Sequence, residues 1–282
     1  MIEPRLVASA WTSAGAASPA LPPSISPVPI AERVAAIADA GFVGFGLAND
    51  DLAVIRDTIG FQGLRNLADE RGIHHIEIEL IERWWIPRGE PGNTHHIQDL
   101  LFEAVEALAP PFIKIGSEQG PRVVDYRMMI EPLRALARRA ADRGTRVAIE
   151  PMPFSAIATL PLGAEIVAAT GHPAAGLVVD AWHVFRAGTS LDDLTATLAP
   201  EMIFGVELDD AAPQAIGTLF EDTVDRRLLC GEGSFDLPGL VEALRTLGFD
   251  GPWGVEILSI DYRALPPRQA LKLAAESALS VL

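Results

Sequence analysis

Four acidic residues, Glu150, Asp180, Glu207 and Glu256, each stand within or at the end of a short apolar run with the composition of a buried strand. Residues two apart on a strand share a face, so each acid lies opposite the β-branched residues of its own run. Carboxylates that converge in a confined space repel one another and need a proton or a cation. Hard oxygen ligands suit Mn²⁺ or Mg²⁺, with Co²⁺ or Zn²⁺ as alternatives. The pattern therefore predicts one divalent-metal site, although any single acid could instead form a salt bridge to Arg or Lys.

Other residues near these acids could also take part in chemistry. His183 follows Asp180 by three residues, so its ring could serve as a metal ligand, an acid/base group or a substrate hydrogen-bond donor, or be an ordinary loop histidine. Lys114 and Glu79 have the same inward parity and could reach a substrate. We expect Glu77 to form a buried ion pair with Lys114, lower in the interior enclosed by the strands.

Aromatic and basic side chains follow the same strand ends. Trp11 and Trp182 could stack on the apolar face of a sugar, or simply pack beneath long loops. Arg186, Arg226 and Arg227 could bind an anionic or polyhydroxyl substrate, or form surface salt bridges. We take Trp11, Lys114, Trp182, Arg186 and Arg226 as candidate substrate-binding residues.

The elements that must position these residues alternate along the chain. Short β-branched runs are separated by Ala/Leu/Arg-rich helical stretches, which indicates βα units and a parallel sheet. The expected strands are Arg5–Trp11, Phe42–Leu47, His75–Leu80, Phe112–Gly116, Arg146–Pro151, Gly176–Asp180, Met202–Asp209 and Trp253–Leu258. The expected helices are Ile30–Ala40, Leu52–Arg71, Ile97–Ala109, Tyr126–Arg143, Leu162–Thr170, Leu191–Leu198, Leu237–Leu247 and Pro267–Leu282. Eight such units predict a single α/β domain over residues 1–282, a (β/α)8 TIM barrel whose active site lies at the carboxyl ends of the strands.

Charge and composition exclude several partners. The 38 acidic and 22 basic side chains give a formal charge of −16, which would repel nucleic acid and an anionic membrane surface. The single cysteine, Cys230, excludes an internal disulfide framework and suits a reducing cytoplasm. The segment Leu6–Ala20 lacks a basic cluster before it, so we expect it to be mature sequence rather than a signal peptide. We expect a cytoplasmic enzyme with a small-molecule substrate, and the sequence leaves open whether it forms a homo-oligomer.

Four short motifs carry a family resemblance. They are Ile149-Glu150-Pro151, Val179-Asp180-Ala181-Trp182-His183, Gly231-Glu232-Gly233-Ser234-Phe235-Asp236 and Gly251-Pro252-Trp253-Gly254-Val255-Glu256. In this order they resemble the xylose isomerase-like TIM barrel superfamily, the sugar phosphate isomerase/epimerase group. That group includes ketose 3-epimerases, inosose dehydratases and 3-dehydroshikimate dehydratases.

The resemblance implies roles for the acids and two departures from the family pattern. It implies a metal held by Glu150, Asp180, Glu207 and Glu256, proton transfer by Glu150 and Glu256, and contact of His183 with substrate. Position 207 is usually His or Gln in this family, so Glu207 makes the ligand set all-carboxylate. Ketose 3-epimerases carry a further glutamate shortly after the first ligand, and residues 151–156 contain none.

The primary functional hypothesis is a metal-dependent isomerase or epimerase of a sugar or polyol-derived ketone, working by proton transfer through a metal-stabilised enediolate. The second uses the same site as a lyase or dehydratase, by β-elimination from an inosose, 3-dehydroshikimate or a keto-glycoside, with His183 as acid for the leaving group. A remote alternative is an apurinic-site endonuclease, and the last is a non-catalytic binding protein. The sequence leaves open the substrate, the metal, and which glutamate is acid and which is base.

Overall fold

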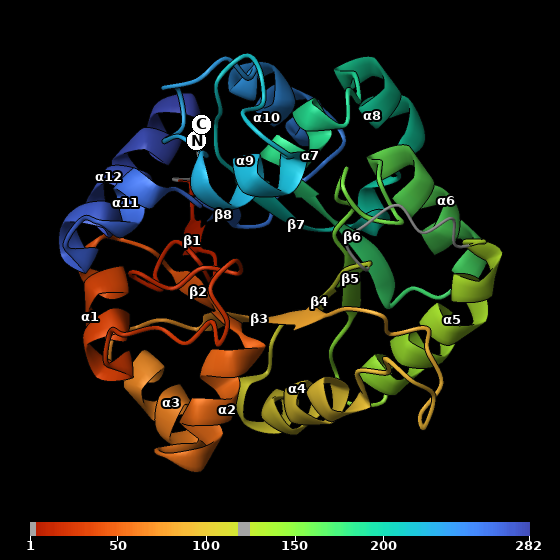
Figure 1. The fold of residues 1–282 in the computed structure, drawn as a ribbon, viewed down its shortest axis with the longest axis horizontal. Helices are drawn as coiled ribbons and strands as arrows, with labels where there is room; N and C mark the ends of the chain where they lie inside the picture. Colours follow the sequence, from red (N-terminus) through yellow and green to blue (C-terminus); the bar gives the residue numbers. More distant parts are fainter. Residues whose placement is uncertain (1–3, 118–124) are drawn as a thin grey trace.

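Eight parallel strands close into a barrel with helices on its outside (Figure 1). The computed structural model describes residues 4–117 and 125–282. The strands are β1 Leu6–Ala8, β2 Gly44–Ala48, β3 His75–Ile81, β4 Ile113–Ile115, β5 Val147–Ile149, β6 Ala175–Asp180, β7 Ile203–Leu208 and β8 Trp253–Val255. Each pairs in parallel with the next, and β8 pairs with β1. The predicted barrel and the positions of its eight strands are confirmed.

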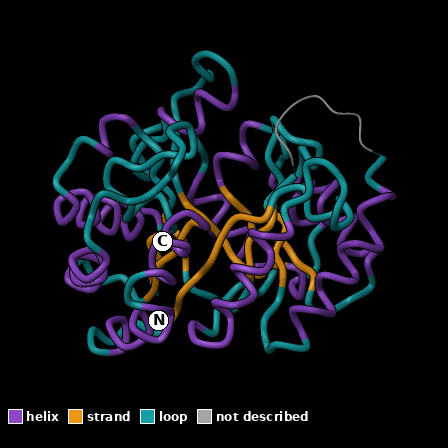
Figure 2. Tube along the Cα trace, turned by 60° about the horizontal axis from the view of Figure 1, so that its bottom comes forward, coloured by secondary structure: helices purple, strands orange, loops and turns teal. Residues whose placement is uncertain are grey.

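The helices form an outer layer around the strands, as the turned view in Figure 2 shows. They are α1 Ile30–Asp39, α2 Asn49–Asp57, α3 Gly60–Asp69, α4 His95–Leu108, α5 Arg127–Ala141, α6 Leu160–Thr170, α7 Ala181–Arg186, α8 Leu191–Thr197, the 3₁₀ helix η1 Pro200–Met202, α9 Leu219–Asp225, α10 Leu237–Thr246, α11 Ile260–Arg263 and α12 Pro267–Val281. Within the described ranges, none of these helices combines the length and apolarity needed to cross a membrane.

The prediction of one helix over Leu52–Arg71 is wrong, because α2 and α3 are separate helices. The Thr58 hydroxyl donates to the carbonyl of Val54 at 2.7 Å, and Gly60 has a φ of +70°. A left-handed residue interrupts the helical hydrogen-bond ladder, and glycine adopts that conformation without steric cost.

The barrel interior is divided into an apolar floor and a polar upper layer. Phe112, Ala148, Val178 and Phe204 form a buried cluster of their own, separate from the large core between strands and helices. A Cβ on Gly205 would lie 2.8 Å from the ring of Phe112, so the absence of a side chain there leaves room for the ring. Because the floor is filled, inward side chains further along the strands are held near the carboxyl-terminal mouth.

Thr12 joins the end of β1 to the end of β8. Its hydroxyl donates to the carbonyl of Val255 at 2.7 Å and accepts from the amide of Ile257 at 2.8 Å. The hydroxyl of Tyr262 donates to the Thr12 carbonyl at 3.0 Å. These bonds fix the loop that carries Trp11 beside the strand end that carries Glu256.

Candidate metal centre and active site

The four predicted acids converge at the mouth of the barrel. Glu150, Asp180, Glu207 and Glu256, hereafter the carboxylate cage, each offer an oxygen atom, and these atoms all lie within 4.8 Å of one another. All four residues are buried, at 5% exposure or less. Asp180 is the register partner of Glu207, and Glu207 that of Gly254, so the strand pairing itself aligns three of the cage strands. The sequence expectation that strand parity would bring them together agrees with this geometry.

The carboxylate cage is electrostatically unfavourable when it is empty. Burial raises the pKa of Glu150 to about 8, although the ammonium of Lys114 opposes the shift. Burial and the nearby carboxylates raise the pKa of Glu207, and burial raises that of Glu256. Buried carboxyl oxygens that resist ionisation yet face one another are a donor set that suits a hard divalent ion. The residues present therefore fit the metal that the motifs imply.

Lys114 reaches the cage from below. Its ammonium Nζ lies 2.8 and 2.7 Å from the two carboxylate oxygens of Glu207 and 2.9 Å from Glu79. The expected pairing of Lys114 with Glu77 is wrong, because Glu77 instead contacts the ring of His75 at 2.7 Å. Glu77 and Glu79 lie two positions apart on one face of β3, and only Glu79 is within reach of the ammonium.

Arg227 supplies a second buried cation on the other side of the cage. Its guanidinium contacts Asp180 at 2.7 Å, Glu256 at 3.1 Å and also Asp209. Burial alone would raise the pKa of Asp180, but the interactions with Arg227 and His183 together outweigh it and hold that pKa at about 2. Asp180 is thus an ionised ligand candidate at any physiological pH.

The sequence predicted only part of the arrangement of Asp209 and Arg227. The inward parity of Asp209 was available, but its buried pairing with Arg227 depends on a chain reversal that places residue 227 beside β7 and β8.

His183 is presented by α7, a short helix that the sequence patterns did not resolve. The Asp180 carboxylate caps this helix by accepting the amide of His183 at 2.9 Å, so one residue fixes both helix and ring. The imidazole Nε2 lies 3.6 Å from Glu150, and Nδ1 has no hydrogen-bond partner among the described residues. Burial lowers the pKa of His183 to about 3, so the ring is neutral and has a polar atom to offer.

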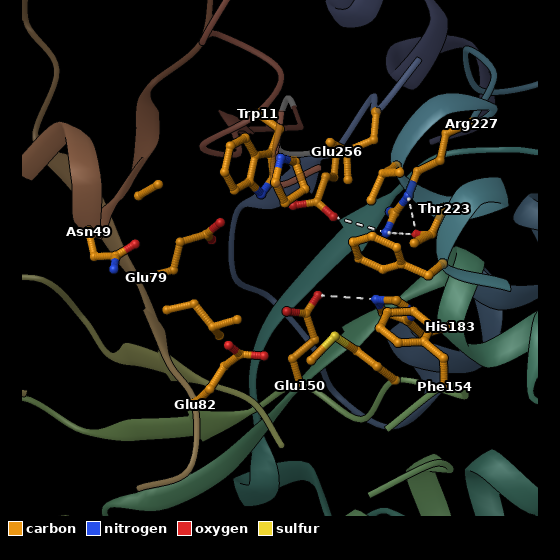
Figure 3. A pocket seen from close by; sticks show the side chains of 17 residues that line it. Trp11, Asn49, Glu79, Glu82, Glu150, Phe154, His183, Thr223, Arg227 and Glu256 are labelled. Carbon is orange, nitrogen blue, oxygen red and sulfur yellow. Dashed lines mark hydrogen bonds and ion pairs between the residues drawn. The ribbon is translucent and has the colours of Figure 1, made fainter. Parts of the chain in front are cut away.

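A pocket with about 600 Å³ of free space, its open mouth included, lies above the cage (Figure 3). Its described lining includes the aromatic rings of Trp11, Phe154 and Phe220. Figure 3 shows acidic side chains directed at the same space, namely Glu79, Glu82, Glu150 and Glu256. Polar groups at the base and aromatic rings at the side are what a small polyhydroxylated ligand requires.

Four of the five candidate substrate-binding residues, Lys114, Trp182, Arg186 and Arg226, are not among the described residues that line this pocket. Trp182 is fully buried, and its indole N–H donates to Asp222 at 3.1 Å. Arg186 donates to the same carboxylate at 3.0 Å, and Arg226 is exposed beside the buried Arg227. Trp182 and His183 are consecutive on α7 and face different directions, so only one of them can face the pocket.

The chain matches one family model and resembles several known proteins and solved structures. A family model described as a xylose isomerase-like TIM barrel matches residues 34–279. A 3-dehydroshikimate dehydratase of Pseudomonas aeruginosa is 26% identical over 244 residues, which cover 84% of this chain and 37% of that protein. This chain thus spans little more than a third of the length of that relative.

An inosose isomerase of Bacillus velezensis is 29% identical over 262 residues, with 77% of this chain and 90% of that protein covered. Among solved structures, the IOLI protein with a bound zinc atom superposes with a TM-score of 0.80 at 20% identity, covering 98% of this chain and 97% of that one. At this identity the likeness concerns the fold.

Proposed function

Because the chain belongs to the xylose isomerase-like TIM barrel family, we propose that it is a divalent-metal-dependent isomerase or epimerase of a sugar or polyol-derived ketone. The observation that carries the proposal is the placement of Glu150 and Glu256. They come from β5 and β8, line one pocket and belong to one carboxylate cage. Two carboxyl groups that line one pocket can act as the base that removes a proton and the acid that returns one.

The carboxylate cage would hold the metal, and a bound divalent ion would polarise the substrate carbonyl and a neighbouring hydroxyl, which acidifies the proton between them. The chain's own groups then transfer that proton. Glu256, contacted by Arg227 at 3.1 Å, is suited to the ionised role of base. Glu150, which lies 3.6 Å from the imidazole Nε2 of His183, is suited to return the proton.

The charge of the pocket favours an uncharged substrate. Four carboxylates and one guanidinium, that of Arg227, are the charged groups in its described lining apart from the histidine. Arg227 already contacts three carboxylates and has little capacity for another anion. Even with the proposed divalent ion bound, these groups leave no excess positive charge to attract a substrate carboxylate or phosphate, whereas the hydroxyl groups of a neutral cyclic or open-chain ketose would find many acceptors. The relative named inosose isomerase agrees with a polyol ketone of this kind.

A lyase acting by β-elimination is the second candidate. Residues 151–156 offer no additional carboxylate beside Glu150, and the corresponding segment is Pro-Met-Pro-Phe-Ser-Ala. The relative named 3-dehydroshikimate dehydratase favours this reaction. Here His183, within 3.6 Å of Glu150, would relay a proton from Glu150 to the departing hydroxyl.

The two reactions are separated by one experiment in D₂O. Chelator-treated protein is reloaded with Mn²⁺ and incubated with ketoses, inososes, 3-dehydroshikimate or keto-glycosides. After turnover the ion is removed, and the products are identified by NMR. A new stereoisomer or ketone isomer carrying deuterium at carbon supports the isomerase, and an alkene with loss of hydroxyl or aglycone supports the lyase. Conversion that continues unchanged without metal would refute the metal-dependent proposal, and Glu256→Gln serves as the inactive control.

A further inference from the structure

The chain contains only two lysines among its 22 basic residues, Lys114 and Lys272. Lys272 lies on α12 with a side chain that is 70% exposed, whereas the side chain of Lys114 is 1% exposed. Everywhere else the sequence uses arginine. A lone buried ammonium at the centre of an acidic cluster is therefore an isolated feature of this chain.

Strand register explains how Lys114 enters the carboxylate cage. Its Cα pairs with that of Ala148, two residues before Glu150, so it starts on the level of the apolar floor. Two residues of strand rise about 6.6 Å, a height that the extended lysine side chain can span. The ammonium therefore arrives among the carboxylates with its stem packed in the barrel interior.

The contacts of the ammonium are unequal. It engages both oxygens of Glu207 at 2.7 and 2.8 Å, whereas Glu150 and Glu256 are each 3.7 Å away. Glu207 is thus both a cage member and the main partner of a resident cation. A metal ion that takes an oxygen of Glu207 must share it with Lys114 or displace the ammonium, and the two cations repel each other in either case.

We propose that Lys114 is an internal competitor of the divalent ion for Glu207: it holds the carboxylate cage together without metal and weakens metal binding. This inference rests on the proposed metal site. Its functional consequence is a preformed cage with reversible metal occupancy, instead of a site that loses its arrangement when the metal leaves.

The sign of one substitution distinguishes competition from support. If Lys114 competes, Lys114→Met removes a positive charge and frees Glu207, so Mn²⁺ binds more tightly. If Lys114 merely orients Glu207 as a ligand, the same change lets the carboxylate move and Mn²⁺ binds more weakly. Calorimetric titration of chelator-treated protein with Mn²⁺ measures the difference, and we expect at least a tenfold gain in affinity. Lys272→Met is the matched control and leaves the affinity unchanged.

A second measurement uses the unmodified chain, so it holds even where Lys114→Met folds poorly. Protein labelled with ¹⁵N-lysine carries two side-chain Nζ resonances, which Lys272→Met assigns. On titration with Mg²⁺, the Lys114 resonance is expected to shift until one equivalent is bound, while that of Lys272 stays constant.

The outcomes separate this inference from the proposed function. Equal or weaker Mn²⁺ binding by Lys114→Met, or an unmoved Lys114 resonance while Mg²⁺ binds, overturns the competition and leaves the metal site intact. Absence of metal binding by both the unmodified chain and Lys114→Met overturns the metal site and the competition together.

Discussion

Replacing Arg227 by methionine removes the guanidinium that three buried carboxylates share. Methionine keeps much of the volume, so the main effect is electrostatic. Asp180, Asp209 and Glu256 are each buried to at least 97%, and Arg227 contacts all three. Asp209 is the most destabilised of the three, because its other carboxylate oxygen has no hydrogen-bond partner among the described residues.

The size of the effect follows from this burial. Removing one partner of a buried ion pair costs about 3–5 kcal/mol, because the remaining charge is left unpaired in a poorly solvated place. At roughly 2–4 °C per kcal/mol for a large domain, the midpoint of thermal unfolding falls by roughly 6–20 °C. A second substitution, Asp209→Asn, removes the stranded charge and recovers part of the loss, so the two changes are not additive.

Urea unfolding and calorimetry in the presence of a chelator measure this prediction without a contribution from bound metal. Arg226→Met is the matched control, because the neighbouring arginine is exposed and its loss changes stability by less than about 0.5 kcal/mol. A loss below about 1 kcal/mol for Arg227→Met, or an equal loss in the two variants, would refute the assignment of Arg227 as the counter-ion of the cage.

Three further predictions concern pH, the pocket wall and the packing of β7 on β8. The folded chain holds the proton of Glu150 up to about pH 8, whereas the unfolded chain releases it near 4.5, so the contribution of Glu150 to stability is fully present below that lower value and is lost as pH rises through 8. Thermal melts of metal-free protein should therefore show falling midpoints between pH 7 and 8, with a smaller fall in Glu150→Gln; a rising midpoint would contradict this. Phe154→Ala removes a pocket-lining ring that packs on His183 at 5.9 Å, and steady-state kinetics should show a roughly 2- to 12-fold rise in KM; an unchanged KM would place substrate elsewhere. Gly254→Ala places a Cβ 2.5 Å from the Val206 carbonyl and 2.8 Å from Glu207, so denaturant unfolding should show a loss of about 1–3 kcal/mol, and a neutral result would contradict the close packing of β7 on β8.

The parts of this fold that sequence could predict are those set by short-range periodicity. Alternation with a period of two assigns Glu150 and Asp180 to the inner faces of their strands without knowledge of the neighbours. Glycine after a helix is an equally local signal, because it adopts the left-handed conformation that ends a helix, and Gly171 and Gly248 have positive φ.

The parts that escaped prediction depend on three-dimensional approach. The contact of Lys114 with Glu207 crosses the barrel between β4 and β7, residues 93 apart in the chain, and no local pattern encodes it. Which of Trp182 and His183 faces the pocket depends on where α7 begins, which the Asp180 cap decides. Arg226 and Arg227 are chemically alike in sequence, and only the folded chain shows that the second of them is buried.

The binding of Mn²⁺ to chelator-treated protein, followed by the loss of its free-ion electron paramagnetic resonance spectrum, tests the carboxylate cage most directly. The account predicts one equivalent bound per chain, strong loss of binding in Asp180→Asn and Glu256→Gln, and no change in Glu276→Gln on the surface of α12. Failure of the unmodified chain to bind Mn²⁺, or unchanged binding in both cage variants, would contradict it.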